Sequence, residues 1–378
     1  MHKYLLMSVI GSVIFYNIVF AIILFFLKKG ERNRQLKYLG LFILILLSVF
    51  RFDIGNDYEN YYNTIKRISS YLNVYNLNLN SLMMFEEYGV EPSFIFFIWL
   101  FHKFENTYVY VFGVYSLITI YFWYKALKAN KGLFWGIYAI IVFSILFNSY
   151  NGVRQGVAYA IFLYSVQFLA YETRNIKKYI LYILLAGVFH TSALFLLVLP
   201  IIKFKKTYAN TYVIIIAISY VISLLGLFSG IQMFIFKHSL GYSEFLEHEK
   251  QIASNIGGGI IYTMLIFIQT FLMYRVKNNP LYTNLLFIGI MLFCISSGNL
   301  NINRFAFYFL YIVTLAVPYF MKSEKSKFLI QSFTFITFLL FQYNIINGDG
   351  KDGCVPYDYV GSENCEIERL RIRDYKDY

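Results

Sequence analysis

Long apolar runs recur along this chain, and they restrict its fold more than any other feature of the sequence. Each of the longer runs covers about 17–24 residues, the length that a helix needs to cross a bilayer. Hydrophobic residues make up 58% of the chain and charged residues only 14%, whereas a soluble domain is about half apolar and a quarter charged. We therefore expect an all-α, polytopic integral membrane protein with about ten full transmembrane helices plus two partial, re-entrant or interfacial helices.

The polar segments between and after these runs indicate how the chain is organised. The sequence contains no visible internal repeat and no second soluble domain, so we expect a single transmembrane domain over residues 1–346. Two large external loops are predicted at residues 51–93 and 229–258. A polar C-terminal tail follows at residues 347–378.

The net charge of +12 comes from short clusters of Lys and Arg between the apolar runs. Such clusters mark the cytoplasmic ends of membrane helices, so we expect no nucleic-acid partner. Their alternation places residues 151–155 on the outer face. The run 179–202 departs from the alternation because lysines flank both of its ends. It is either a hairpin or broken helix that starts and ends in the cytoplasm, which keeps the later loops in order, or a plain span.

A polar segment interrupts two apolar runs at residues 151–156, with the sequence Asn-Gly-Val-Arg-Gln-Gly. An arginine at the centre of a bilayer costs roughly 2.5–3.5 kcal/mol, so one that occurs there usually faces a cavity or a partner. Arg154 lies between Gly152 and Gln155, and Asn151 precedes it. Under the hairpin interpretation, Arg51 and Arg304 lie on the same outer face. Three guanidinium groups on one side suit a diphosphate, although interface anchoring explains each of them as well.

Other candidate residues surround these arginines. Of the five histidines, only His190 lies within a long apolar run. It could act there as a general base or be purely structural. Asp53 and Asp57 could hold Arg51, bind a metal that accompanies a diphosphate, or orient a sugar hydroxyl; a solvated loop start is the alternative. Tyr58 could stack on a sugar or belong to an interfacial aromatic belt.

The sequence gives no sign of a cofactor. No pair of histidines has metal-site spacing on a helix, and no nucleotide-binding motif is present, so we expect neither a metal nor a cofactor. Cys354 and Cys365 share the polar tail. They could form a disulfide if the tail is external, and are free thiols otherwise.

Three motifs in order resemble the EpsG family of polysaccharide polymerases, relatives of the Wzy-type enzymes. The first is Arg-x-x-x-Gly-Asn-Asp-Tyr at residues 51–58, where the family often has Thr at the position of Asn56. The second is Asn-x-x-Arg-Gln-x-x-Ala at 151–158, and the third is Phe-His-x-Ser-Ala at 189–193. A weaker fourth is Asn303–Arg304 with Tyr308.

The resemblance implies a polymerase that transfers a glycan from a polyprenyl-diphosphate-linked donor to a hydroxyl of a lipid-linked repeat unit. The reaction would take place on the outer face of a bacterial cytoplasmic (inner) membrane and produce an O-antigen, exopolysaccharide or capsule. Arg154, Arg304 and Arg51 would bind the diphosphate, His190 would be the base with Asp57 as its rival, and a GT-C-like architecture is compatible. A flippase and a chain-length regulator are the implied partners.

Two other classes of protein fit parts of the same pattern. A lipid-linked oligosaccharide flippase or another transporter would also line a cavity with arginines, but it would be expected to show paired halves. A membrane O-acyltransferase would also use an intramembrane histidine.

The remaining polar residues that we expect at the substrate are Asn151, Gln155, Asp53 and Tyr58.

Overall fold

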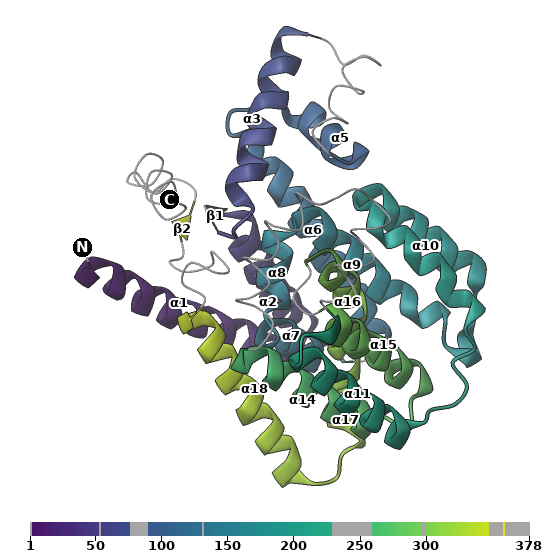
Figure 1. Cartoon of the computed structure of the whole chain (residues 1–378). Coiled ribbons are helices and arrows are strands. Elements are labelled where there is room, and N and C mark those ends of the chain that lie inside the picture. The colour runs from purple at the N-terminus through teal and green to yellow at the C-terminus, as the bar shows by residue number, and fades with distance from the viewer. Residues whose placement is uncertain are drawn as a thin grey trace. The chain divides into compact units, whose positions relative to one another are not determined.

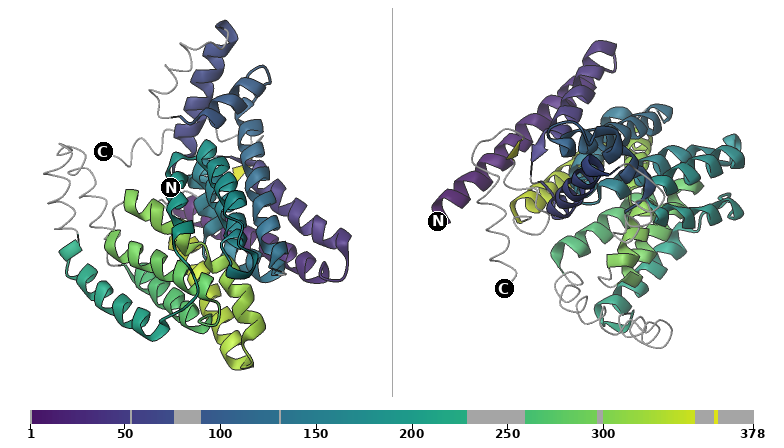
Figure 2. Two further views of the ribbon diagram at one scale, coloured as in Figure 1. Left: turned by 90° about the vertical axis from the view of Figure 1, so that its right-hand side faces the viewer. Right: turned by 90° about the horizontal axis from the view of Figure 1, so that it is seen from above.

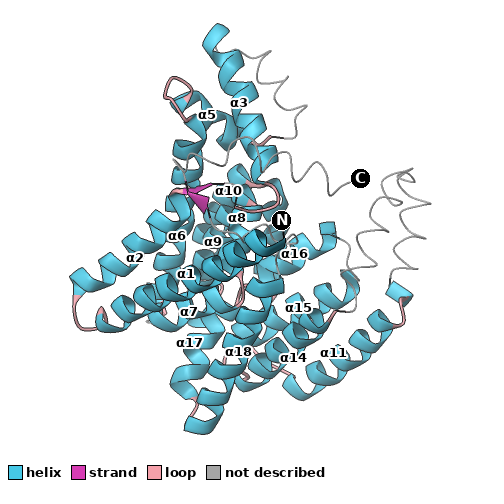
Figure 3. Ribbon diagram, turned by 90° about the vertical axis from the view of Figure 1, so that its left-hand side faces the viewer, coloured by secondary structure: helices cyan, strands magenta, loops and turns pink. Residues whose placement is uncertain are grey.

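The computed structural model describes residues 2–52, 54–75, 90–130, 132–228, 259–296, 300–347 and 358–359. Their secondary structure is almost entirely helical, apart from one pair of two-residue strands (Figure 3). The all-α prediction is therefore confirmed. By their contacts, the residues form two compact units: the first comprises Met1–Leu117, Phe147–Val153 and Ile345–Tyr378, and the second comprises Ile118–Leu146 and Arg154–Asn344. The expected external loop at 229–258, Asp53, Cys354 and Cys365 lie outside the described residues.

The first unit begins with two antiparallel helices, α1 (His2–Lys29) and α2 (Arg34–Val49), which pack side by side (Figures 1 and 2). The turn between them is short, and the Asn33 side chain caps α2 by accepting a hydrogen bond from the Gln35 N–H. Strand β1 (Arg51–Phe52) follows and pairs antiparallel with β2 (Asp358–Tyr359).

The rest of the first unit is built on aromatic contacts. Helix α3 (Tyr58–Val74) packs on α5 (Pro92–Phe101) and presents Tyr58 and Tyr62 to α6 (Thr107–Ala129). The end of α8 (Ile145–Asn151) also belongs to this unit. Because α5 has only 10 residues, it is too short to cross a bilayer, in agreement with the expectation of partial helices.

The second unit contains the second half of α6, from Ile118 onward, together with the remaining helices, and its helices α15 and α16 cross closely. An added Cβ at Gly289 of α15 would lie 2.8 Å from the backbone N of Leu310, so α15 and α16 can pack this tightly only around a glycine. Its elements are α7 (Leu133–Val142), α9 (Val153–Ser165), η1 (Val166–Phe168), η2 (Tyr171–Thr173), α10 (Ile176–Phe189), η3 (Thr191–Ile201), α11 (Ala209–Leu224), α14 (Ile260–Arg275), α15 (Pro280–Ser296), α16 (Leu300–Leu310), α17 (Val313–Ser323) and α18 (Lys327–Asn347).

Three helical stretches of the described residues are long and apolar enough to cross a membrane: Ile10–Lys29, Ile302–Ser323 and Lys327–Ile346. A fourth is α7 with α8, if this pair counts as one span despite a bend of 61° at Ser144, which has a φ of 55°. The expected count of about ten full spans is not confirmed. The physical reason is that several predicted runs are divided into shorter apolar helices.

The run 179–202 is one of these divided segments, and it folds back on itself. Helix α10 ends at His190, which has extended backbone angles (φ −156°, ψ 116°), and η3 then returns along α10. The Tyr179 hydroxyl donates to the Leu196 carbonyl at 2.9 Å, and the Arg174 guanidinium donates to the Pro200 carbonyl. The two ends of the run therefore lie together with His190 at the tip, as the hairpin interpretation predicts.

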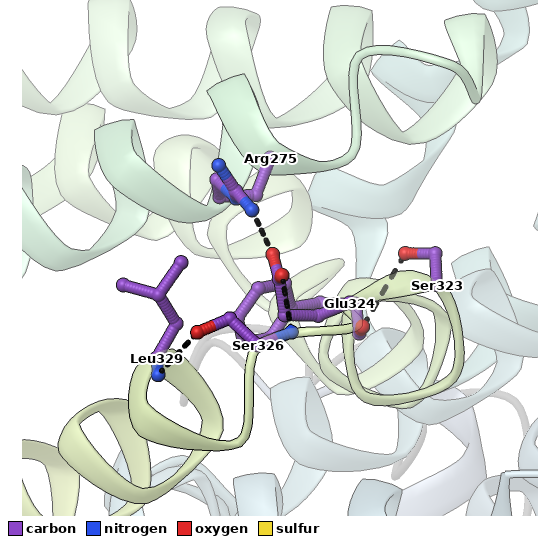
Figure 4. A network of polar contacts seen from close by, with 6 residues as sticks. Arg275, Ser323, Glu324, Ser326 and Leu329 are labelled. Atoms are coloured by element: carbon purple, nitrogen blue, oxygen red, sulfur yellow. Dashed lines mark hydrogen bonds and ion pairs between the residues drawn. The ribbon is translucent and has the colours of Figure 1, made fainter.

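Polar contacts join the chain segments at the opposite end of the second unit from His190. Glu324 pairs with Arg275 of α14 and accepts a hydrogen bond from the Ser326 N–H at 2.9 Å (Figure 4). The Lys322 ammonium donates to the Asn130 carbonyl at 3.2 Å, and Asn284 donates to the Lys206 carbonyl at 3.0 Å.

These contacts favour the hairpin interpretation of the run 179–202. The Tyr282 hydroxyl also binds the Asn130 side chain at 2.7 Å, so residues near 130, 206, 282 and 324 share one side of the unit. A plain span would place residue 130 on the opposite side from the later segments. The hairpin interpretation requires the arrangement that is observed.

Candidate functional site

The candidate site forms where three elements of the second unit meet: the start of α9, the tip of the α10–η3 hairpin, and the start of α16. Each element contributes one basic side chain that the sequence singles out, Arg154, His190 and Arg304 respectively. The three elements are far apart in the sequence, and α9 and α16 lie beside each other (Figure 1).

The contact between α9 and α16 is centred on the backbone of Arg304. The Arg304 carbonyl accepts hydrogen bonds from Gln155 Nε2 at 3.3 Å and from the Tyr159 hydroxyl at 3.0 Å. Gln155 and Tyr159 are four residues apart, so they share one face of α9. Ser296 of α15 donates to Asn303 Oδ1 at 2.6 Å, which fixes the residue before Arg304.

The tip of the hairpin also packs on α16, through Ser192 and Phe195. The hydroxyls of Ser192 and Tyr308 are 3.1 Å apart and share a hydrogen bond. The centre of the Phe195 ring lies 4.7 Å from that of Phe305 and 5.7 Å from that of Tyr308. The ring centres of Tyr159 and Tyr308 are 4.4 Å apart. Edge-on aromatic contacts at these distances stabilise a specific docking geometry.

This packing brings the three basic side chains together. Arg154 and Arg304 both lie near enough to His190 for their positive charges to act on its imidazole. His190 and Arg154 are half-buried and Arg304 is exposed. Among the residues that the structure describes, the Arg304 guanidinium makes no hydrogen bond or ion pair, so its donors are available to an anionic ligand.

The other expected site residues that are described belong to the first unit. Arg51 is only 2% exposed, and Tyr58 is 3% exposed within an aromatic cluster with Tyr62 and Phe112. Asp57 is half-buried at the start of α3. Asn151 accepts a hydrogen bond from the backbone N–H of Asn56 at 2.6 Å. Their roles in substrate binding remain predictions.

Tyr159 is the residue at this site that the sequence analysis missed. Its signal was present, because it lies one helical turn after Gln155 on the same face of α9. Within the described part of the chain, no three His, Cys, Asp or Glu side chains lie close enough to hold a metal ion. Cys294 is a buried free thiol.

One comparison with known proteins identifies the family of this chain. The model of the EpsG family matches residues 36–359, a range that includes Arg51, Arg154, His190 and Arg304. Comparison with curated proteins and with solved structures gives no match. Since the match covers most of the chain, the protein belongs to the EpsG family, a family of Wzy-like polymerases.

Proposed function

We propose that this protein is a membrane polysaccharide polymerase. It transfers a glycan from a polyprenyl-diphosphate-linked donor to a hydroxyl of a second lipid-linked repeat unit. Membership of the EpsG family supports a polymerase-type activity. The observation that supports the specific reaction is the packing of α9 and the hairpin tip against α16, because these three elements carry Arg154, His190 and Arg304.

Arg304 and Arg154 hold the diphosphate of the donor. Guanidinium groups bind phosphate oxygens through paired, charge-assisted hydrogen bonds, and Arg304 has exposed donors for this purpose. Negative charge on the diphosphate grows as its bond to the sugar breaks. Arg154 and Arg304, which we call the clamp, are already in place and therefore stabilise the transition state more than the ground state.

His190 accepts the proton of the attacking hydroxyl. The acceptor oxygen bonds to the anomeric carbon of the donor, and the bond between this carbon and the diphosphate oxygen breaks with its electron pair on the diphosphate. The hydroxyl proton moves to the His190 imidazole. The diphosphate held by the two arginines adds negative charge beside the imidazolium that forms, which supports the base and the clamp working as one group. Asp57 remains the rival base.

The reaction takes place on the outer face of a bacterial cytoplasmic membrane, and the charge pattern of the hairpin supports this orientation. Lysines and arginines at the end opposite His190 would lie in the cytoplasm, according to the positive-inside rule. The donor is already activated as a diphosphate, so the reaction requires no nucleotide sugar. A flippase would supply the lipid-linked units, and a chain-length regulator would act on the product, which is an O-antigen, exopolysaccharide or capsule.

Alanine variants of His190 and Arg154 test this proposal in cells. We expect both variants to lose long-chain polysaccharide while single repeat units are still exported, because transfer fails and translocation continues. His102→Ala, a histidine of the first unit, is the matched control and should keep normal chain length. Long chains at normal expression in both variants would contradict the assignment. Loss of exported single units as well would favour a flippase.

A further inference from the structure

The turn that follows β1 is shaped by Gly55, in the first motif. Gly55 has a φ of +106°, a backbone conformation that side-chain-bearing residues rarely adopt. Its carbonyl accepts a hydrogen bond from the Tyr58 N–H at 3.0 Å, which closes the turn at the start of α3. The glycine of this motif therefore has a backbone role.

The same turn lies directly against the end of α8, within the first unit. The Asn56 N–H donates to Asn151 Oδ1 at 2.6 Å. A Cβ added at Gly55 would lie 2.7 Å from Asn151 Oδ1 and 3.2 Å from the Tyr150 carbonyl oxygen. The Asn151 amide oxygen thus joins two segments that are 95 positions apart in the chain. It binds the Asn56 N–H and lies so close to Gly55 that only glycine fits there.

Arg51 supports this contact, because its guanidinium lies against the face of the Tyr150 ring. Its guanidinium carbon lies 4.4 Å from the centre of the Tyr150 ring and 5.2 Å from that of Phe112. The guanidinium donates to the Ser48 carbonyl and to Ser116 Oγ, the latter at 3.1 Å. The Tyr150 hydroxyl is itself 2.9 Å from Ser48 Oγ. Both of these guanidinium hydrogen bonds come from Nη1, and since Arg51 is 2% exposed, its guanidinium is held inside the protein.

We propose that Arg51 and Asn151 are positioning residues that fix the start of α9, rather than ligands of the diphosphate. Asn151 ends α8, and Arg154 is the third residue after it in the chain. The joint formed by Arg51, Gly55, Asn56, Tyr150 and Asn151 therefore holds the end of α8 and, through the chain, Val153, the first residue of α9, which belongs to the same unit. This role rests on the proposed function of Arg154, because only then does the position of α9 govern the reaction.

The chemistry of Asn151 gives a test that separates the two roles. Asn151→Asp keeps an oxygen acceptor for the Asn56 N–H, but it removes the amide donors and adds a negative charge. A positioning residue survives this change, whereas a diphosphate ligand does not. We expect Asn151→Asp to keep polymerisation within about threefold of the unchanged protein and Asn151→Ala to reduce it about fivefold or more.

Purified protein with lipid-linked repeat units provides the measurement. The reduction in Asn151→Ala should appear in kcat, with little change in the KM for the donor, and its thermal unfolding temperature should fall. Asn148→Ala is the matched control: Asn148 lies on α8, and its side chain makes no hydrogen bond to any described residue. Inactive Asn151→Asp protein with a normal unfolding temperature, or a raised KM in Asn151→Ala, would overturn the inference.

Parallel measurements on Arg154→Ala and His190→Ala distinguish the two proposals. If both variants polymerise normally, the proposed function fails, and the unfolding temperatures of the Asn151 variants still test the joint. An unfolding temperature in Asn151→Ala equal to that of the unchanged protein would overturn the joint in either case. If both variants are inactive and Asn151→Asp is inactive too, the proposed function stands and the positioning role is wrong.

Discussion

The hydroxyls of Ser192 and Tyr308 lie 3.1 Å apart, and this hydrogen bond joins the tip of the α10–η3 hairpin to α16. It places the element that carries His190 against the element that carries Arg304. The catalytic arrangement that we propose therefore depends on the docking of a hairpin tip, because neither element holds both residues.

Removal of this hydrogen bond should impair the reaction more than folding. We expect Ser192→Ala, Tyr308→Phe and the double variant to lose polymerisation to a similar degree, because each breaks the same bond, at a cost of about 1 kcal/mol. Chain length in cells and kcat in vitro provide the measurement. Tyr282→Phe removes a comparable bond to Asn130 at the other end of the unit and should leave chain length unchanged. Additive losses in the double variant would disprove the coupling.

Arg304 should be required for activity and dispensable for stability. Its guanidinium is exposed, so Arg304→Ala should leave the thermal unfolding temperature unchanged while it lowers kcat by about 100-fold or more. Arg304→Lys should recover only part of the loss, since an ammonium lacks the paired donors of a guanidinium. Lys177→Ala, an exposed cation at the other end of the unit, serves as the control. Normal turnover in Arg304→Ala would remove this residue from the clamp.

The ion pair of Arg275 and Glu324 should stabilise the end of the second unit opposite His190. The side chain of Glu324 is 8% exposed, so Arg275→Ala leaves a nearly buried carboxylate without its cation and should lower the free energy of unfolding by about 2 kcal/mol. Thermal unfolding in detergent measures this loss. Exchange of the two charges in Arg275→Glu/Glu324→Arg should recover most of the stability. If the single variant is as stable as the unchanged protein, the pair has no structural role.

Labelling from outside the cell should show where the hairpin ends. In a protein whose three native cysteines are replaced by serine, cysteines at Lys206 and Lys277 should resist a membrane-impermeant maleimide, because both positions are predicted to be cytoplasmic. A cysteine at Asn151 gives the external comparison. Rapid labelling at Lys206 without permeabilisation would contradict the proposed orientation of the second unit and would place Arg304 on the wrong face.

The sequence predicts helices and the hairpin because both follow from local patterns. Lysines on either side of residues 179–202 indicate that this run starts and ends on one side, and the contact of Arg174 with Pro200 agrees. Breaks within apolar runs are harder to predict. The left-handed backbone of Ser144 bends α7 away from α8, yet its neighbours are as apolar as those of an unbroken span.

Long-range polar contacts were equally hidden from the sequence. Arg51 and Asn151 are polar residues in motifs, and this pattern alone favours ligands. Only the fold reveals that the Arg51 guanidinium packs on the Tyr150 ring and that the Asn151 side chain binds the backbone of Asn56. Side-chain type predicts chemistry, whereas the partner of each side chain depends on packing between distant segments.

The most direct test is polymerisation by purified protein supplied with a polyprenyl-diphosphate-linked repeat unit and no nucleotide sugar. We predict that the unchanged protein forms long chains and releases polyprenyl diphosphate, and that His190→Ala and Arg154→Ala form neither although they fold normally. Chains of normal length from His190→Ala, or none from the unchanged protein with intact donor, would contradict the account.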